Sequence, residues 1–203
     1  YLNNGNDTFR DVTNSAKVGF SGASQLAVAV DYDGDENVDL FVVNNNGPSV
    51  LYRNLGNGKF QNVAGSAGVA GPHKGRAATF SDFDHDGDYD LLLAQSEGGN
   101  LLFANNRGKF TRVTNVDLSN ANNPSSTTGG DTDNDGDVDV VIGDSDGGGN
   151  SGDSVYINSG GGENHWITIV LQGTQSNRSA IGAKVLVRTG NILQVGVVSS
   201  GNG

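Results

Sequence analysis

The stretch Asp131-Thr-Asp-Asn-Asp-Gly-Asp-Val-Asp139 places five carboxylates at alternate positions, and an apolar run, Val140–Gly143, follows it directly. Two other segments align with it, Asp31-Tyr-Asp-Gly-Asp-Glu-Asn-Val-Asp39 and Asp82-Phe-Asp-His-Asp-Gly-Asp-Tyr-Asp90. We name these segments loop 1 (31–39), loop 2 (82–90) and loop 3 (131–139). They start 51 and 49 residues apart, and such a fixed period predicts a repeat architecture.

A second shared element follows each acidic segment by about ten residues. It reads Val50-Leu-Tyr-Arg-Asn-Leu-Gly-Asn-Gly-Lys-Phe60, Leu101-Leu-Phe-Ala-Asn-Asn-Arg-Gly-Lys-Phe110 and Tyr1-Leu-Asn-Asn-Gly-Asn-Asp-Thr-Phe9, with a partial copy at Val155-Tyr-Ile-Asn-Ser-Gly-Gly-Gly162. Gly-rich pairs between apolar runs predict hairpins. With strands expected at Leu40–Val43, Leu91–Ala94 and Val140–Gly143, each unit is a group of short strands. The prediction is an all-β fold of propeller-like blades or a stacked array.

The composition agrees with short strands and turns. Of 203 residues only 34% are apolar, and 32 are Gly, a poor helix former. Cys is absent, which excludes disulfides and thiolate metal sites. The longest apolar run, Trp166–Leu171, is too short to span a bilayer.

The charge is concentrated in the three loops. The net charge is −11, and the loops hold 15 of the 23 carboxylates and no Lys or Arg. This excess of negative charge argues against nucleic acid and anionic membranes as partners. Five carboxylates within nine residues repel one another, and a bound cation removes that repulsion.

Calcium is the cation that fits these loops best, because it takes six to eight oxygen ligands in flexible geometry. Aspartates at positions 1, 3 and 5 can converge on one ion, and position 7 offers a backbone carbonyl. Gly87 and Gly136 at position 6 permit a sharp turn, whereas Glu36 predicts a distorted or weaker first site. An EF-hand would need a Glu at position 12, but Val42, Leu93 and Ile142 stand there. A solvated acidic turn is the alternative, and three copies in register argue against it.

This pattern resembles the FG-GAP/VCBS repeats, which are also found in integrin-type β-propellers. The resemblance covers residues 1–160 and implies about three calcium ions, with a further ligand at position 9. The implied ligands are Asp31, Asp33, Asp35, Asn37 and Asp39; Asp82, Asp84, Asp86, Asp88 and Asp90; and Asp131, Asp133, Asp135, Asp137 and Asp139. Asn37, Asp88 and Asp137 would contribute through their carbonyls.

The segment 161–203 differs from the repeats and predicts a small β domain. Asn164–Gly173 alternates like a strand, and Lys184–Arg188 and Gln194–Ser199 are two further β-like runs. The segment resembles the start of the ASPIC/UnbV domain. The matching residues are Asn164, His165, Trp166, Leu171, Gly173, Ser176, Asn177, Arg178, Ile181, Gly182 and Ala183. Extracellular proteins of the cartilage acidic protein type share this layout, which implies no catalysis.

The sequence contains residues that match catalytic motifs, but their surroundings in the sequence do not support catalysis. Gly143-Asp-Ser-Asp-Gly147 matches G-x-S-x-G, but the Gly-rich residues 147–152 cannot begin the helix that a nucleophile elbow needs. His73, His85 and His165 show no metal-ligand spacing. Asn6 and Asn177 lie in glycosylation sequons, which would be used only in a secretory pathway. No catalytic residue is therefore assigned.

These observations predict an extracellular, calcium-braced structural or adhesion module that binds a protein or a glycan. One alternative is a subunit of a self-assembling filament or sheath, and another is a non-catalytic scaffold of a polysaccharide-active enzyme. The sequence starts in mid-repeat with Tyr1 rather than Met. We therefore expect the first repeat to be covered by a missing part of the chain, by a second copy bound head-to-tail, or by the C-terminal segment.

Overall fold

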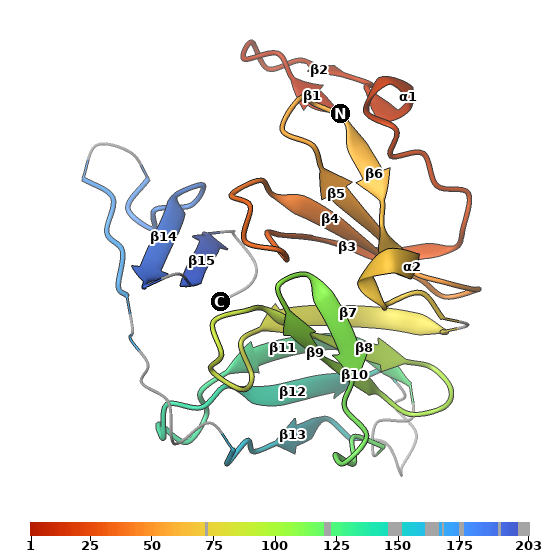
Figure 1. Cartoon of the computed structure of the whole chain (residues 1–203), viewed down its shortest axis with the longest axis vertical. Coiled ribbons are helices and arrows are strands. Elements are labelled where there is room, and N and C mark those ends of the chain that lie inside the picture. Colours follow the sequence, from red (N-terminus) through yellow and green to blue (C-terminus); the bar gives the residue numbers. More distant parts are fainter. Residues whose placement is uncertain are drawn as a thin grey trace.

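The computed structural model describes residues 1–71, 73–119, 123–145, 152–160, 167, 169–174, 177–190 and 192–198. Within these ranges the chain forms fifteen strands and two one-turn helices (Figure 1). The predicted all-β fold class is confirmed. The strand-rich result follows from the sequence, in which Gly and turn residues separate short apolar runs.

Three antiparallel sheets repeat one strand order. The first contains β3 (Ser24–Val30), β4 (Asp39–Asn44), β5 (Val50–Asn54) and β6 (Phe60–Asn62), paired in that order. The second pairs β7 (Gly75–Ser81), β8 (Asp90–Gln95), β9 (Leu101–Asn106) and β10 (Lys109–Arg112) in the same way. The third contains β11 (Pro124–Gly130), β12 (Asp139–Asp144) and β13 (Ser154–Tyr156). Each acidic loop therefore connects the first two strands of its sheet.

The N-terminal hairpin repeats the last two strands of a sheet. It pairs β1 (Leu2–Asn3) with β2 (Phe9–Arg10), and the short helix α1 (Thr13–Ala16) follows it. The first sheet ends in the same sequence of elements, since β5 and β6 precede α2 (Ala64–Ala67). Phe9 is 63% exposed, whereas Phe110, which holds the corresponding place on β10, is buried. The difference arises because Phe110 packs against another repeat, through Tyr32.

The sheets are stacked (Figure 1). Their facing sides form two apolar cores. Phe41 and Leu51 of the first sheet pack with Leu91 and Leu93 of the second. Leu92, on the opposite side of β8, packs with Val140 and Ile142 of the third sheet. Every residue of β8 is buried. This explains why the run Leu91–Ala94 is continuously apolar rather than alternating.

Beyond the third sheet, the structure bears out two of three predicted strands. β14 (Lys184–Thr189) and β15 (Ile192–Val197) form an antiparallel hairpin of their own. The strand predicted over Asn164–Gly173 is wrong for residues 167 and 169–173, which lie outside any strand. Ile167 and Val170 are exposed, so their side chains are not covered by any sheet of the described residues. Residues 164–166 and 168, with His165 and Trp166, lie outside the described residues.

Candidate metal centre

The three loops share one backbone conformation, built on two left-handed residues. Positions 4 and 6 have positive φ in each loop: Gly34 and Glu36, His85 and Gly87, and Asn134 and Gly136. Glu36 has φ 68°, whereas Gly87 and Gly136 have φ 97°, so loop 1 keeps the left-handed turn of the other loops with a different angle at this position. A glutamate holds this conformation with strain that glycine lacks.

The turns direct backbone N–H groups at the first aspartate of each loop. Asp31 accepts hydrogen bonds from the N–H groups of Gly34, Asp35 and Glu36. Asp131 accepts from Asn134 at 2.7 Å and from Gly136 at 3.2 Å. These bonds fix the position of the first carboxylate beside the other carboxylates of its loop.

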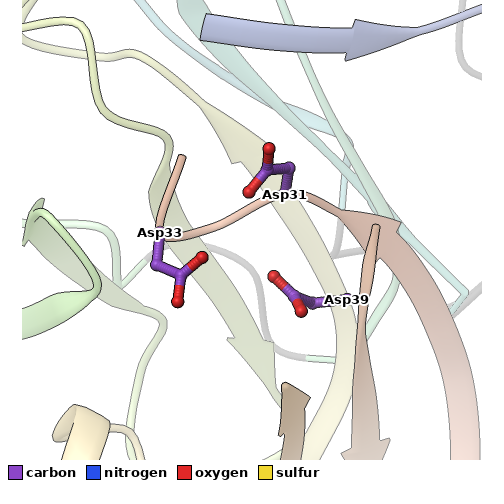
Figure 2. Close-up of side chains that lie close together, drawn as sticks. All are labelled: Asp31, Asp33 and Asp39. Carbon is purple, nitrogen blue, oxygen red and sulfur yellow. The ribbon is translucent and has the colours of Figure 1, made fainter. Parts of the chain in front are cut away.

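Three carboxylates converge in every loop, with oxygen atoms within 4.8 Å of one another. The groups are Asp31, Asp33 and Asp39; Asp82, Asp84 and Asp86; and Asp131, Asp133 and Asp139. Figure 2 shows the first group, in which the three carboxylates point toward a common space. The other predicted side-chain ligands, Asp35, Asp90 and Asp135, lie outside these groups.

The residues at position 7 use their side chains in different ways. Asn37 donates its side-chain amide to Asp35 Oδ1 at 3.0 Å. Asp88 Oδ2 accepts the backbone N–H of Arg107 at 2.7 Å, and Asp137 is buried. Asp137 also lies 3.8 Å from Nδ1 of His85, so loops 2 and 3 approach each other here.

The aspartate at position 9 ties its loop to the following hairpin. Asp39 accepts the N–H groups of Tyr32 and Asn54, at 3.3 and 2.7 Å. Asp90 accepts the N–H groups of Phe83 and Asn105. Asp139 accepts those of Thr132 and Asn158. All three carboxylates are buried. The aspartate at position 9 is thus a structural anchor in every loop. In loops 1 and 3 it is also a member of the converging carboxylate group.

Burial determines the acidity of two of these anchors. It raises the pKa of Asp39 and of Asp90 to about 7, despite the backbone N–H groups that each accepts. The pKa of Asp139 is instead lowered, because the Thr132 hydroxyl donates to it together with backbone N–H groups. A divalent cation beside a buried carboxylate favours its ionised form.

An asparagine that recurs at one position of the hairpin element contacts the loops and was not predicted from the sequence. Asn54, Asn105 and Asn158 occupy one position in three copies of the hairpin element, and each donates its side-chain amide to the carbonyl at position 8 of its own loop. Their Oδ1 atoms accept the N–H of Gly56, Gly108 and Gly160, which closes the hairpin turn. The recurrence of Asn at this position was the signal that could have identified it.

The oxygen donors fit a hard cation such as calcium. Asp33 Oδ1 and Asp82 Oδ1 are buried and have no hydrogen-bond partner in the part of the chain that the structure describes. A buried carboxylate oxygen without a partner is costly, and a cation would satisfy it. The donor chemistry and these two oxygens therefore support the fit.

Loop 1 differs because an arginine shares its carboxylates. Arg53 Nε lies 2.7 Å from Asp33 Oδ2, and Arg53 Nη2 lies 2.9 Å from Asp35 Oδ2. Ala104 and Ile157 hold the corresponding positions in the next two repeats. The guanidinium supplies loop 1 with one positive charge of its own.

The remaining candidate residues lie away from the loops. Asn6 is exposed, and the Asn177 amide donates to the carbonyl of Ile181 within a turn. Ser145 Oγ donates to the carbonyl of Asn123 and accepts from its side-chain amide. The helix that a Ser145 nucleophile elbow would need falls on residues 146–151, which are outside the described part.

Comparison with known proteins agrees with this geometry. The profile of the FG-GAP-like repeat matches residues 31–93 and 82–142, each match starting at an acidic loop. Cartilage acidic protein 1 is 42% identical over 66 residues in Mus musculus, 41% over 66 residues in Homo sapiens and 38% over 74 residues in Xenopus tropicalis. These matches cover 32%, 32% and 35% of this chain, and 10%, 10% and 11% of the relatives. Because the repeat profile spans more than half of its residues, the chain belongs to the FG-GAP-like repeat family.

Proposed function

We propose that this chain is an extracellular, non-catalytic repeat module in which calcium bound by the three acidic loops braces the stacked sheets. The observation that carries the proposal is the convergence of three carboxylates in each loop. In loops 1 and 2, one of these carboxylates has a buried oxygen with no hydrogen-bond partner among the described residues. The carboxylates of these groups would hold the ions: Asp31, Asp33 and Asp39 in loop 1; Asp82, Asp84 and Asp86 in loop 2; and Asp131, Asp133 and Asp139 in loop 3. A bound calcium would neutralise the carboxylates of its group, and in loops 1 and 3 it would also join the two ends of the loop.

The site chemistry favours calcium over magnesium. Magnesium requires near-ideal octahedral geometry and retains several waters, whereas calcium accepts irregular arrangements of carboxylates and carbonyls. Each loop here offers carboxylates and backbone carbonyls from a turn between two strands. Occupancy should be weakest in loop 1, where Arg53 competes for Asp33 and Asp35.

An extracellular setting would match such sites, since extracellular modules commonly bind calcium in the 10⁻⁴–10⁻³ M range. The similarity to cartilage acidic protein 1 supports this placement. No helix within the described ranges is long and apolar enough to cross a membrane. We also propose that residues 161–203 belong to an ASPIC/UnbV-like segment and that the partner is an extracellular protein or glycan.

Calorimetric unfolding in excess calcium, excess magnesium and EGTA tests the proposal. An ion at a hundred times its Kd stabilises a native site by ~2.7 kcal/mol, or roughly 5–10 °C in Tm per filled site for a chain of this size. Calcium should therefore raise Tm well above its value in EGTA or magnesium. A Tm that is the same in calcium and EGTA would contradict the proposal.

Titration calorimetry of matched variants assigns the ions. Asp33→Ala, Asp84→Ala and Asp133→Ala alter position 3 of each loop and should each remove one calcium from the stoichiometry. Asp117→Ala changes an exposed aspartate outside the loops and serves as the control. If the three loop variants bind as much calcium as the control, the assignment of ligands is wrong.

A second function, head-to-tail assembly, has its own supporting observation. Val155 and Ile157, at the third sheet, are 56% and 54% exposed, and Tyr1, Leu2 and Phe9 are exposed at the N-terminal hairpin. Apolar side chains at both ends of a stack suit contact with a further repeat. Analytical ultracentrifugation in calcium tests this, and a monomer at all concentrations would exclude it.

A further inference from the structure

The C-terminal hairpin lies against the acidic loops rather than apart from the repeats. Lys184 Nζ donates to the carbonyl oxygen of Glu36, and Arg188 Nη2 lies 3.7 Å from Glu36 Oε1. Leu193 of β15 lines a cavity of about 370 Å³ between loops 1 and 2, together with Asp33 and Asp86. Figure 1 shows the hairpin beside the ends of the sheets that carry these loops.

One contact reaches a candidate calcium ligand. Gln194 Nε2 donates to Asp82 Oδ2 at 2.6 Å, across 112 positions of sequence. The same oxygen accepts the N–H of Gly87 at 3.1 Å. The other oxygen, Asp82 Oδ1, is buried and has no hydrogen-bond partner within the described residues. Asp82 is therefore fixed through one oxygen, and its second oxygen is available to a cation.

Loop 3 shows no such donor among the described residues and provides a comparison. Both oxygens of its first aspartate, Asp131, accept backbone N–H groups of the loop itself. Loop 2 instead receives a side-chain donor from a distant element. The amide of Gln194 carries no charge, so it orients Asp82 without competing for a cation as Arg53 does in loop 1.

We propose that Gln194 is a positioning residue for calcium in loop 2, and that calcium binding and docking of the C-terminal hairpin are consequently coupled. This inference rests on the proposed calcium function. Hydrogen bonds to a metal-ligating carboxylate orient the ligand, and their loss typically weakens metal binding 10–100-fold. The coupling is reciprocal, so calcium in loop 2 must also hold the hairpin in place.

Calcium titration of the full chain by ¹H–¹⁵N NMR measures each loop separately. The Gly87 amide reports on loop 2 and the Gly136 amide on loop 3. Gln194→Ala should weaken calcium binding at Gly87 about tenfold and leave the affinity at Gly136 unchanged. Gln61→Ala, which removes an exposed glutamine from β6, is the matched control and should change neither.

Hydrogen exchange of the hairpin tests the coupling in the other direction. Calcium should slow exchange of the β14–β15 amides at least severalfold in the parent protein, and much less in Gln194→Ala. Unchanged affinity at Gly87 in this variant, or hairpin exchange that is indifferent to calcium, would overturn the inference. If neither Gly87 nor Gly136 responds to calcium in the parent protein, the calcium function itself fails.

Discussion

Asn105 in the second repeat donates its side-chain amide to the backbone carbonyl of Tyr32 in the first, at 2.8 Å. The relationship recurs one repeat later, where Asn158 donates to Phe83 at 2.7 Å. In both cases the acceptor is position 2 of the preceding acidic loop, while the same asparagine also binds its own loop. This residue therefore connects neighbouring sheets at the edge where the candidate metal sites lie.

Asn105→Ala should lower the free energy of unfolding by roughly 2–3 kcal/mol, because it leaves buried carbonyls of two repeats without a donor. Asn54→Ala is the matched control, since Asn54 makes the corresponding bonds within its own repeat but has no such link to another repeat among the described residues. The variants should differ by about 1 kcal/mol in urea unfolding. Equal losses would show that the bond between repeats contributes nothing measurable.

Arg53→Ala should strengthen calcium binding in loop 1. A unit charge about 4 Å from a divalent ion costs on the order of 2 kcal/mol even in bulk water, so we expect an affinity gain of about thirtyfold. In EGTA the same variant should be less stable than the parent, because Asp33 and Asp35 lose their counter-ion. Titration calorimetry measures the first effect and thermal unfolding the second. Arg10→Ala, on exposed β2, is the control, and an unchanged loop 1 affinity in Arg53→Ala would contradict the role of Arg53.

Gly136→Ala should destabilise the protein by about 1 kcal/mol or more. Gly136 has φ 97°, a conformation in which a Cβ is strained. Gly65→Ala should be neutral or slightly stabilising, since a Cβ at Gly65 meets no atom within 4 Å and alanine favours helix α2. Thermal unfolding of both variants in calcium checks the contrast, and similar Tm values would refute it.

His73 should give stability a pH dependence in calcium-saturated protein. Burial, aided by the Arg112 charge, lowers the pKa of His73 below its ordinary 6.5. The folded state then binds fewer protons than the unfolded state, so this contribution is complete above pH 6.5 and is lost as pH falls through the lowered pKa. His73→Gln should remove that part of the acid sensitivity, whereas Lys74→Gln, at an exposed ion pair, should keep the parent profile. Unfolding curves between pH 7.5 and about 5 give the free energy of unfolding of each variant as a function of pH. If this free energy changes with pH equally in His73→Gln and in the parent, the role assigned to His73 is wrong.

The repeat pattern allowed the strands and loops to be predicted because those features depend on neighbouring residues. Alternate aspartates before an apolar run set both the turn and the strand that follows, as in Asp90–Gln95. The position of Arg53 beside loop 1 and the contact between Gln194 and Asp82 depend on tertiary packing. No local spacing encodes a contact across 112 positions. The predicted strand is absent at residues 167 and 169–173 for a related reason, because alternation alone does not supply a pairing strand.

The asparagine links all point from a later repeat to an earlier one. A ribosome releases the chain in the same direction, and domains generally fold N-terminal first as synthesis proceeds. Where the repeats fold in that order, the acceptor carbonyls of Tyr32 and then of Phe83 are in place before the asparagine that donates to them is synthesised. The direction of this hydrogen bond therefore suits a folding order that follows synthesis. In that order, each repeat completes its contacts with the repeat before it.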